Sequence, residues 1–126
     1  MRREKDIKLF DNKDFGDLGE KIAQTYLRLF GFEIINCNFR TKEGEIDIIA
    51  EKSDILHFIE VKTRKNKNIM ARQSIGIQKC EHIWRVAEYY LYKKRISNVE
   101  CQIDAMEVYI EENSLQINFI PRIIEK

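Results

Sequence analysis

The chain has few of the residues that mark linkers and sharp turns. Pro121 is its one proline among 126 residues, and it has five glycines. No stretch has the composition of a flexible linker and no segment repeats, so the sequence shows no boundary between domains. A chain of this length can bury one ordinary hydrophobic core and is too short to expect two. We therefore expect a single domain over residues 1–126.

Long apolar runs and paired cysteines are also absent. No run approaches the roughly 20 apolar residues that span a bilayer, and the charged start Met-Arg-Arg-Glu-Lys-Asp is followed by no signal-peptide core. The cysteines Cys37, Cys80 and Cys101 are odd in number and far apart, which argues against a disulfide framework and fits a reducing compartment. The sequence predicts a cytoplasmic protein whose cysteines are small core residues.

Acidic residues are missing from one window of a chain whose net charge is +1. No Asp or Glu lies between Glu60 and Glu81, and the basic residues of this window are Lys62, Arg64, Lys65, Lys67, Arg72 and Lys79. This pattern predicts a local basic patch. It is either a solvated loop and helix start or a surface for nucleic-acid phosphates. In the second case Arg64, Lys65, Arg72 and Lys79 are the candidate contacts, which would position DNA without reading its sequence.

Apolar spacing predicts an α/β or α+β domain. Residues 14–30 have helical periodicity, with Asp14 suited to cap the start and Gly31 to end the helix in a left-handed conformation. A second helix is expected at about 74–94. Strands are expected at 33–40, twice within 44–64, and at 99–110 and 115–120. The order α-β-β-β-α-β-β predicts a mixed central β-sheet flanked by helices.

Charged side chains interrupt the two apolar strands of residues 44–64. Asp47, Glu60 and Lys62 lie among Ile, Leu, Phe and Val. Burying such charges costs several kcal/mol unless they are paired or bound to a metal. Because side chains alternate along a strand, Glu60 and Lys62 point to the same face. The charges therefore lie either at a wet edge or in a site.

The turn between these strands decides whether Asp47 joins that face. A turn at Lys52 and Ser53, or one spread evenly over residues 51–54, would pair Ala50 with Ile55. Asp47 would then lie opposite Phe58, diagonal to Glu60 and on its face. A turn one residue longer or shorter would move Asp47 to the other face.

The two faces of this hairpin differ in what they can bury. One face is apolar and suits the core, with Ile46, Ile48, Ala50, Ile55, Ile59 and Val61 interrupted by His57. The face with the charges also carries Ile49, Leu56 and Phe58, so a helix should cover its turn end. We expect the helix of residues 14–30 to be this cover, which would hold Glu20 at the edge of the same site.

Asp47, Glu60 and Lys62 suit hydrolysis of a phosphodiester. Two carboxylates can hold a Mg²⁺ ion, which prefers oxygen ligands and keeps several waters. The ion would polarise the phosphate and lower the pKa of a water, and the lysine would assist that water or stabilise the developing charge. His57 is expected to be a satisfied core histidine, and Cys80 and His82, two apart on a helix, do not suit a zinc site.

At these residues the chain resembles the PD-(D/E)xK nuclease superfamily, and more closely the YraN-type family of small, largely uncharacterised endonuclease-like bacterial proteins. The segments that carry the resemblance are Gly19-Glu20 with Ala23 and Leu27, Asn38-Phe39-Arg40, Gly-Glu-Ile-Asp-Ile-Ile at 44–49 and Phe-Ile-Glu-Val-Lys-Thr-Arg at 58–64. Gln102 departs from the family, which usually has arginine there, and would weaken a phosphate contact.

The resemblance covers about residues 14–110. It implies a restriction-endonuclease-like core over these residues and a role for each matching position. Asp47, Glu60 and the Val61 carbonyl would bind Mg²⁺ or Mn²⁺, Lys62 would be the catalytic lysine, and Glu20 would hold a metal-bound water. Similarity to archaeal Holliday-junction resolvases implies branched DNA as substrate and a homodimer.

Three interpretations of function follow from the sequence. In the first, the protein is a metal-dependent DNA endonuclease acting on branched or repair-intermediate DNA. In the second, it binds DNA or RNA without cutting it. In the third, it is an interaction module of a DNA-processing or membrane-associated complex, for which salt-dependent nucleic-acid binding is not expected.

Overall fold

The computed structural model describes residues 12–65 and 77–124. Their order is that expected from the sequence, and the expected α/β class is confirmed. The elements are α2 (Asn12–Leu29), β1 (Glu33–Thr41), β2 (Gly44–Lys52), β3 (Ile55–Arg64), α3 (Ile77–Lys93), β4 (Glu100–Glu111) and β5 (Ser114–Ile124).

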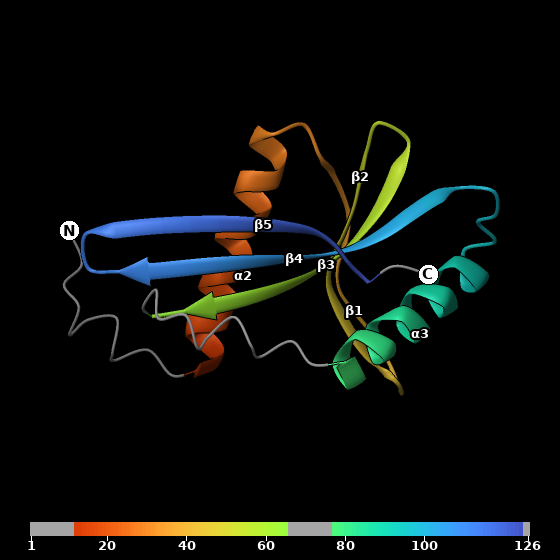
Figure 1. The fold of residues 1–126 in the computed structure, drawn as a ribbon, viewed down its shortest axis with the longest axis horizontal. Helices are drawn as coiled ribbons and strands as arrows, with labels where there is room; N and C mark the ends of the chain where they lie inside the picture. The colour runs from red at the N-terminus through yellow and green to blue at the C-terminus, as the bar shows by residue number, and fades with distance from the viewer. Residues whose placement is uncertain (1–11, 66–76, 125–126) are drawn as a thin grey trace.

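The strands form one mixed sheet in the order β1-β2-β3-β4-β5. Neighbours are antiparallel except β3 and β4, which are parallel and are connected through α3. Figure 1 shows a strong twist, with β1 and β2 running steeply across the direction of β4 and β5. This mixed sheet with its two helices is consistent with a restriction-endonuclease-like core.

Helix α2 ends as expected and begins earlier than expected. Gly31 has a φ of 89°, Gly31 N–H donates to the Arg28 carbonyl at 3.1 Å, and Phe32 N–H donates to the Leu27 carbonyl at 2.9 Å. These bonds form the left-handed C-terminal cap that glycine favours. The prediction that Asp14 caps the start is wrong, because the helix already includes Asn12 and Asp14 lies in the first turn. Its negative charge there still favours the positive end of the helix dipole.

The turn between β2 and β3 differs from the expected one by two positions in register. Ser53 and Asp54 form the turn with φ values of 52° and 65°, and Lys52, not Ala50, lies opposite Ile55. Two residues of positive φ give the hairpin turn that matches the right-handed twist of the strands. Because the shift is an even number of residues, it preserves the predicted alternation of faces on β2 and β3.

The two helices pack on opposite faces of the sheet, and the predicted cover was wrong. Helix α2 packs through Ala23 and Leu27 on the face that includes Ile48 and Ile59. Helix α3 packs on the other face. There its buried residues Ile83, Val86, Ala87 and Tyr90 contact the cluster of Ile49, Leu56 and Phe58. The apolar stripe of α2 therefore covers the more apolar face, not the face that sequence alternation assigned to the charges.

The cysteine prediction holds only in part. Cys37 and Cys101 form no disulfide and are half-buried, and Cys101 packs against the core cluster under α3. The side chain of Cys80 lies outside the described residues.

Neither of the helices in residues 12–65 and 77–124 combines the length and the apolar character needed to cross a membrane.

Candidate metal and nucleic-acid site

The site lies where the pairing of β2 and β3 ends. Ile48 lies opposite Ile59, and this is the last pair of the ladder on the side away from the turn. Beyond it, the backbone N–H of Val61 donates to Asp47 Oδ2 at 2.7 Å. A side-chain carboxylate therefore accepts the hydrogen bond of a strand N–H, and Asp47 is fixed in the notch between the two strands.

Glu60 and Lys62 face this notch from β3, as their spacing predicted. Lys62 Nζ lies 3.2 Å from Glu60 Oε1, and the Glu60 side chain is only 5% exposed. Removing an ion pair from water is costly, so such a pair is weak evidence for stability and is more easily understood as part of a site.

Helix α2 brings a third carboxylate, that of Glu20. The helix can approach β3 closely because its Gly19 has no side chain, and a Cβ at this position would overlap Thr63 Oγ1. The neighbouring Glu20 carboxyl group hydrogen-bonds to that of Asp47. The structure therefore places Glu20 at the same cavity as Asp47 and Glu60, although α2 covers the other face of the sheet, and the role of Glu20 stays a prediction.

Burial and mutual repulsion make this cluster unfavourable when fully ionised. Burial, followed by repulsion from the Glu60 carboxylate, raises the pKa of Asp47 to about 8, although the Val61 N–H acts in the opposite direction. Burial is also the main cause that raises the pKa of Glu20. A hydrogen bond between two carboxyl groups requires one of them to carry a proton, in agreement with these directions.

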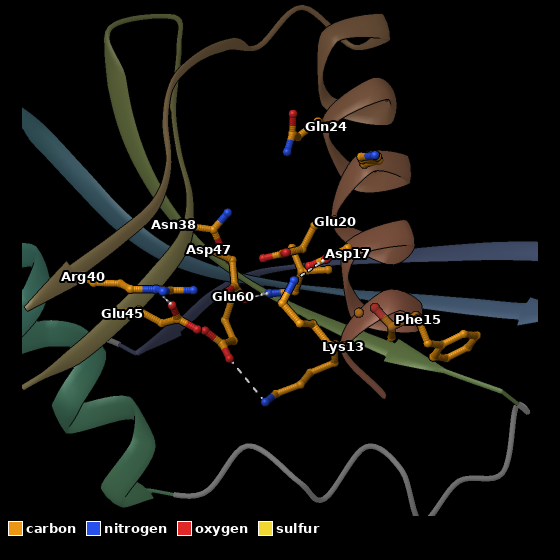
Figure 2. Close-up of a pocket in the computed structure, with 15 residues that line it drawn as sticks. Lys13, Phe15, Asp17, Glu20, Gln24, Asn38, Arg40, Glu45, Asp47 and Glu60 are labelled. Carbon is orange, nitrogen blue, oxygen red and sulfur yellow. Dashed lines mark hydrogen bonds and ion pairs between the residues drawn. The ribbon is translucent and has the colours of Figure 1, made fainter. Parts of the chain in front are cut away.

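These groups line a cavity of about 850 Å³. Its walls are the first half of α2, the end of the β1–β2 hairpin and the last residues of β3 (Figure 2). In Figure 2 Glu20 extends from α2 toward Asp47 and Glu60, while Asn38 and Arg40 come from the hairpin side. The five positions that the resemblance marked all line it: Glu20, Asp47, Glu60, Val61 and Lys62.

The donor set suits a hard cation. Asp47, Glu60 and a backbone carbonyl of Val61 offer only oxygen, which Mg²⁺ and Mn²⁺ prefer. Within residues 12–65 and 77–124, no three side chains of His, Cys, Asp or Glu are placed to hold a metal. A cation here would therefore have two carboxylates and complete its coordination with the carbonyl and water, as Mg²⁺ commonly does. It would also offset the repulsion that raises the pKa of Asp47.

Of the four predicted phosphate contacts, the two whose side chains the structure describes, Arg64 and Lys65, lie outside the cavity lining. Arg64 is half-buried and Lys65 is exposed, with its Nζ 5.5 Å from the centre of the Phe15 ring. Neither is among the residues that line the cavity. Arg72 lies outside the described residues, and Lys79 lies at the start of α3 with its side chain outside them. Their binding to nucleic acid stays a prediction.

His57 is the buried, satisfied histidine that the sequence predicted. Its Nδ1 lies 2.6 Å from Asp104 Oδ2, and the Asp104 side chain is fully buried. Gln102 Nε2 donates to Asp104 Oδ1 at 2.8 Å, and the Arg122 N–H donates to the same oxygen at 3.0 Å. Gln102 is buried and its amide helps to satisfy Asp104, while the weakened phosphate contact at this position stays a prediction.

Sequence reasoning gave no role to the polar residues of β1 that line the cavity. Asn38 and Arg40 were part of the resemblance alone, yet both lie on the cavity wall. One signal could have found Asn38, because asparagine is uncommon within strands and tolerates positive φ better than most other non-glycine residues.

Comparison with known proteins gives consistent relatives. The model of "Uncharacterised protein family UPF0102" matches residues 19–108. A UPF0102 protein of Clostridium beijerinckii is 39% identical over 112 residues, covering 86% of this chain and 91% of the relative. One from Clostridioides difficile is 42% identical over 106 residues, covering 83% and 93%.

A solved structure, that of Pyrococcus furiosus SfsA in complex with Ca²⁺, aligns far more weakly. The identity is 17% and the TM-score is 0.36, over 92% of this chain and 66% of that chain. A likeness at this level carries no weight for fold or function. The family match, in contrast, includes the cavity residues from Glu20 to Lys62, and the chain belongs to the uncharacterised protein family UPF0102.

Proposed function

We propose that the protein is a metal-dependent deoxyribonuclease that hydrolyses phosphodiester bonds in branched or repair-intermediate DNA. The observation that carries this proposal is the meeting of Asp47, Glu60, Lys62 and Glu20 at one cavity. These groups come from β2, β3 and α2, and each has a part in the hydrolysis of a phosphodiester.

Mg²⁺ or Mn²⁺ would be held by the Asp47 and Glu60 carboxylates with the Val61 carbonyl. When bound, the ion supplies Lewis-acid polarisation of the phosphate and a lowered pKa for a water. Burial and repulsion from Glu60, which raise the pKa of Asp47 to about 8, support a cation at this place because it would offset both.

Lys62 and Glu20 would then act on the substrate and the water. The ammonium of Lys62 is held beside Glu60 at 3.2 Å, so its charge is available to the phosphoryl oxygens as they gain negative charge. Glu20 would orient the attacking water and accept its proton. The water oxygen bonds to phosphorus, the bond from phosphorus to a sugar oxygen breaks, and that oxygen is protonated from solvent.

Cleavage of labelled linear, flap and four-way-junction DNA with Mg²⁺ or Mn²⁺ tests the proposal. Wild type should cut, and Asp47→Asn, Glu60→Gln and Lys62→Ala should each lower the rate at least about 100-fold, as expected for loss of a metal or proton-transfer group. Glu51→Gln is the matched control, because Glu51 is an exposed acid on the same strand as Asp47.

DNA binding measured in parallel separates the other outcomes. Salt-dependent binding without cleavage under either metal would indicate a nucleic-acid-binding module in place of an enzyme. Absence of both would favour an interaction module of a DNA-processing complex. Sedimentation of the same samples tests the proposed homodimer, which an enzyme cutting two strands would favour.

A further inference from the structure

The β1–β2 hairpin has a conformational break at two facing residues. Asn38 has a φ of 56°, which is unusual for a residue other than glycine. Cys37 pairs with Ile48 and Phe39 pairs with Ile46, so Asn38 lies directly across from Asp47. The strained residue of β1 is thus the cross-strand neighbour of a proposed metal ligand.

The break turns the end of the hairpin relative to its base. Ile46 and Ile48 are two residues apart and would share a face on a regular strand. Instead, Ile46 packs in the cluster under α3, and Ile48 packs in the cluster under α2. Phe39 follows its partner Ile46 into the α3 cluster. The rotation between these positions lets both Asn38 and Asp47 line the cavity.

The positive φ alone does not explain why residue 38 is asparagine and not glycine. Glycine adopts positive φ without cost, whereas asparagine only tolerates it. In the described part of the chain, the Asn38 side chain makes no hydrogen bond, and it is exposed at the cavity wall. An amide held there at a cost in backbone strain is available to a ligand, which is a common use of strain at functional sites.

Arg40 stands on the same wall and is already oriented. Its Nε donates to Glu45 Oε2 at 2.7 Å, and Glu45 is its cross-strand partner. The Arg40 side chain is 75% exposed. With Nε engaged, the two terminal nitrogens form the outer edge of the guanidinium. This edge suits a phosphate, which arginine can bind through two parallel hydrogen bonds.

We propose that Asn38 and Arg40 bind the phosphate next to the one that is cleaved, and so hold a single nucleic-acid strand across the cavity. Asn38 Nδ2 donates to a phosphate oxygen, and the terminal nitrogens of Arg40 pair with the same group. Glu45 is a positioning residue that orients Arg40. Contacts of this kind fix the backbone of the strand and leave its sequence unread. The inference rests on the proposed function of this site.

Binding can be measured apart from cleavage in the Asp47→Asn protein, which lacks one of the proposed metal ligands. Fluorescence anisotropy with a labelled 12-nucleotide single strand, over a range of salt concentrations, gives the affinity and its salt dependence. Adding Arg40→Ala should weaken binding about tenfold and lower the log–log salt slope by about 0.7, the value for one phosphate contact on a single strand. Lys93→Ala, an exposed cation at the end of α3, is the control and should match the parent.

Asn38→Gly separates the amide from the backbone conformation. Glycine keeps the positive φ, so the melting temperature should not fall, yet affinity should drop about threefold to tenfold because one hydrogen bond is lost. In wild-type background the same substitution should raise KM more than it lowers kcat. Asn38→Ala should in addition lower the melting temperature, because alanine is strained at this φ.

Each outcome bears on the inference. Parent-like affinity and salt slope for Arg40→Ala and Asn38→Gly would overturn it, even if the wild type cuts DNA. Weakened binding in both variants supports it, even if the wild type does not cut, in which case the proposed catalysis fails alone. Absence of salt-dependent binding by the Asp47→Asn parent overturns it as well.

Discussion

Asp47 Oδ2 accepts the backbone N–H of Val61 at 2.7 Å, at the point where the ladder between β2 and β3 ends. The bond couples the separation of two strands to the position of a carboxylate. Asp47 Oδ2 takes the place of a backbone carbonyl as the acceptor for the Val61 N–H. This bond fixes Asp47 within reach of Glu20 and Glu60. The geometry that opens the cavity therefore also sets its acidic cluster.

The acidic cluster of Glu20, Asp47 and Glu60 should destabilise the fold at alkaline pH. The pKa of Asp47 rises from 3.8 to about 8 in the folded chain, so the folded state holds the proton more tightly than the unfolded state. Ionising Asp47 therefore lowers the free energy of unfolding as pH rises through this interval.

Asp47→Asn removes this ionisation and keeps an oxygen for the Val61 N–H. In EDTA at pH 8 we expect it to unfold about 4 °C or more above wild type, on the order of 1 kcal/mol, with the difference shrinking toward pH 4. Thermal melts followed by circular dichroism measure this. Glu51→Gln is the control. Equal melting temperatures of Asp47→Asn and wild type at pH 8 would contradict the raised pKa of Asp47 in the folded state.

Divalent cations should stabilise the folded wild type, because they would offset the negative charge of the acidic cluster. With 10 mM Mg²⁺ and a dissociation constant of about 1 mM, binding to the folded state alone would add about 1.4 kcal/mol of stability. The melting temperature of wild type should rise with Mg²⁺ or Mn²⁺, and that of Glu60→Gln or Asp47→Asn should stay nearly constant. Isothermal titration at pH 7 should show proton release on binding, since the ion displaces the proton that Asp47 carries. A cation-induced rise of equal size in Glu60→Gln would place the ion elsewhere.

Side-chain alternation and turn length predicted much of the site, but they could not predict the rotation of the β1–β2 hairpin. The pairing of Glu60 with Lys62 follows from their spacing, and Asp47 joins them although the predicted register was two residues off. An even error preserves the faces of a strand, so this prediction was robust to the mistake.

The same reasoning could not predict the rotation at the end of the β1–β2 hairpin. Period-two alternation assumes a regular strand, and the positive φ of Asn38 breaks it. For that reason Ile46 and Ile48 were assigned to one face, whereas they pack under different helices. The choice of covering helix failed for a related reason, because which apolar stripe fits which face depends on tertiary packing and on close approaches such as that of Gly19.

The buried hydrogen-bond network around Asp104, whose members do not line the cavity, offers a test of a role in folding alone. Asp104 is fully buried and holds His57, Gln102 and the Arg122 N–H. Asp104→Ala leaves these groups without their acceptor and should lower the free energy of unfolding by about 3 kcal/mol or more. Urea denaturation measures this loss. If the network only supports the fold, the residual folded protein at 15 °C should keep the wild-type rate of DNA cleavage per folded molecule. A selective loss of cleavage without loss of stability would instead connect this cluster to the site.

Gly19 allows α2 to approach the end of β3, and its replacement tests how closely Glu20 must be held. Gly19→Ala would place a methyl group against the Thr63 side chain, and forcing extra volume into such a contact costs about 1–3 kcal/mol. We expect Gly19→Ala to lower stability by this amount and to reduce cleavage, because the displaced helix carries Glu20 away from Asp47. Adding Thr63→Ala should restore part of both, since it removes two of the three atoms in the contact.

Gly16→Ala is the matched control on the same helix. A Cβ at Gly16 has no atom within 4 Å, so alanine should stabilise the helix by about 0.5–1 kcal/mol through its better helix propensity. Chemical denaturation and cleavage rates on the four proteins separate a packing effect from a helix-propensity effect. Because both substitutions improve helix propensity, opposite signs for Gly16→Ala and Gly19→Ala would assign the loss to the contact with Thr63. Equal stabilisation by both would show that α2 can move away from β3 without cost, and that Glu20 is not held by this close approach.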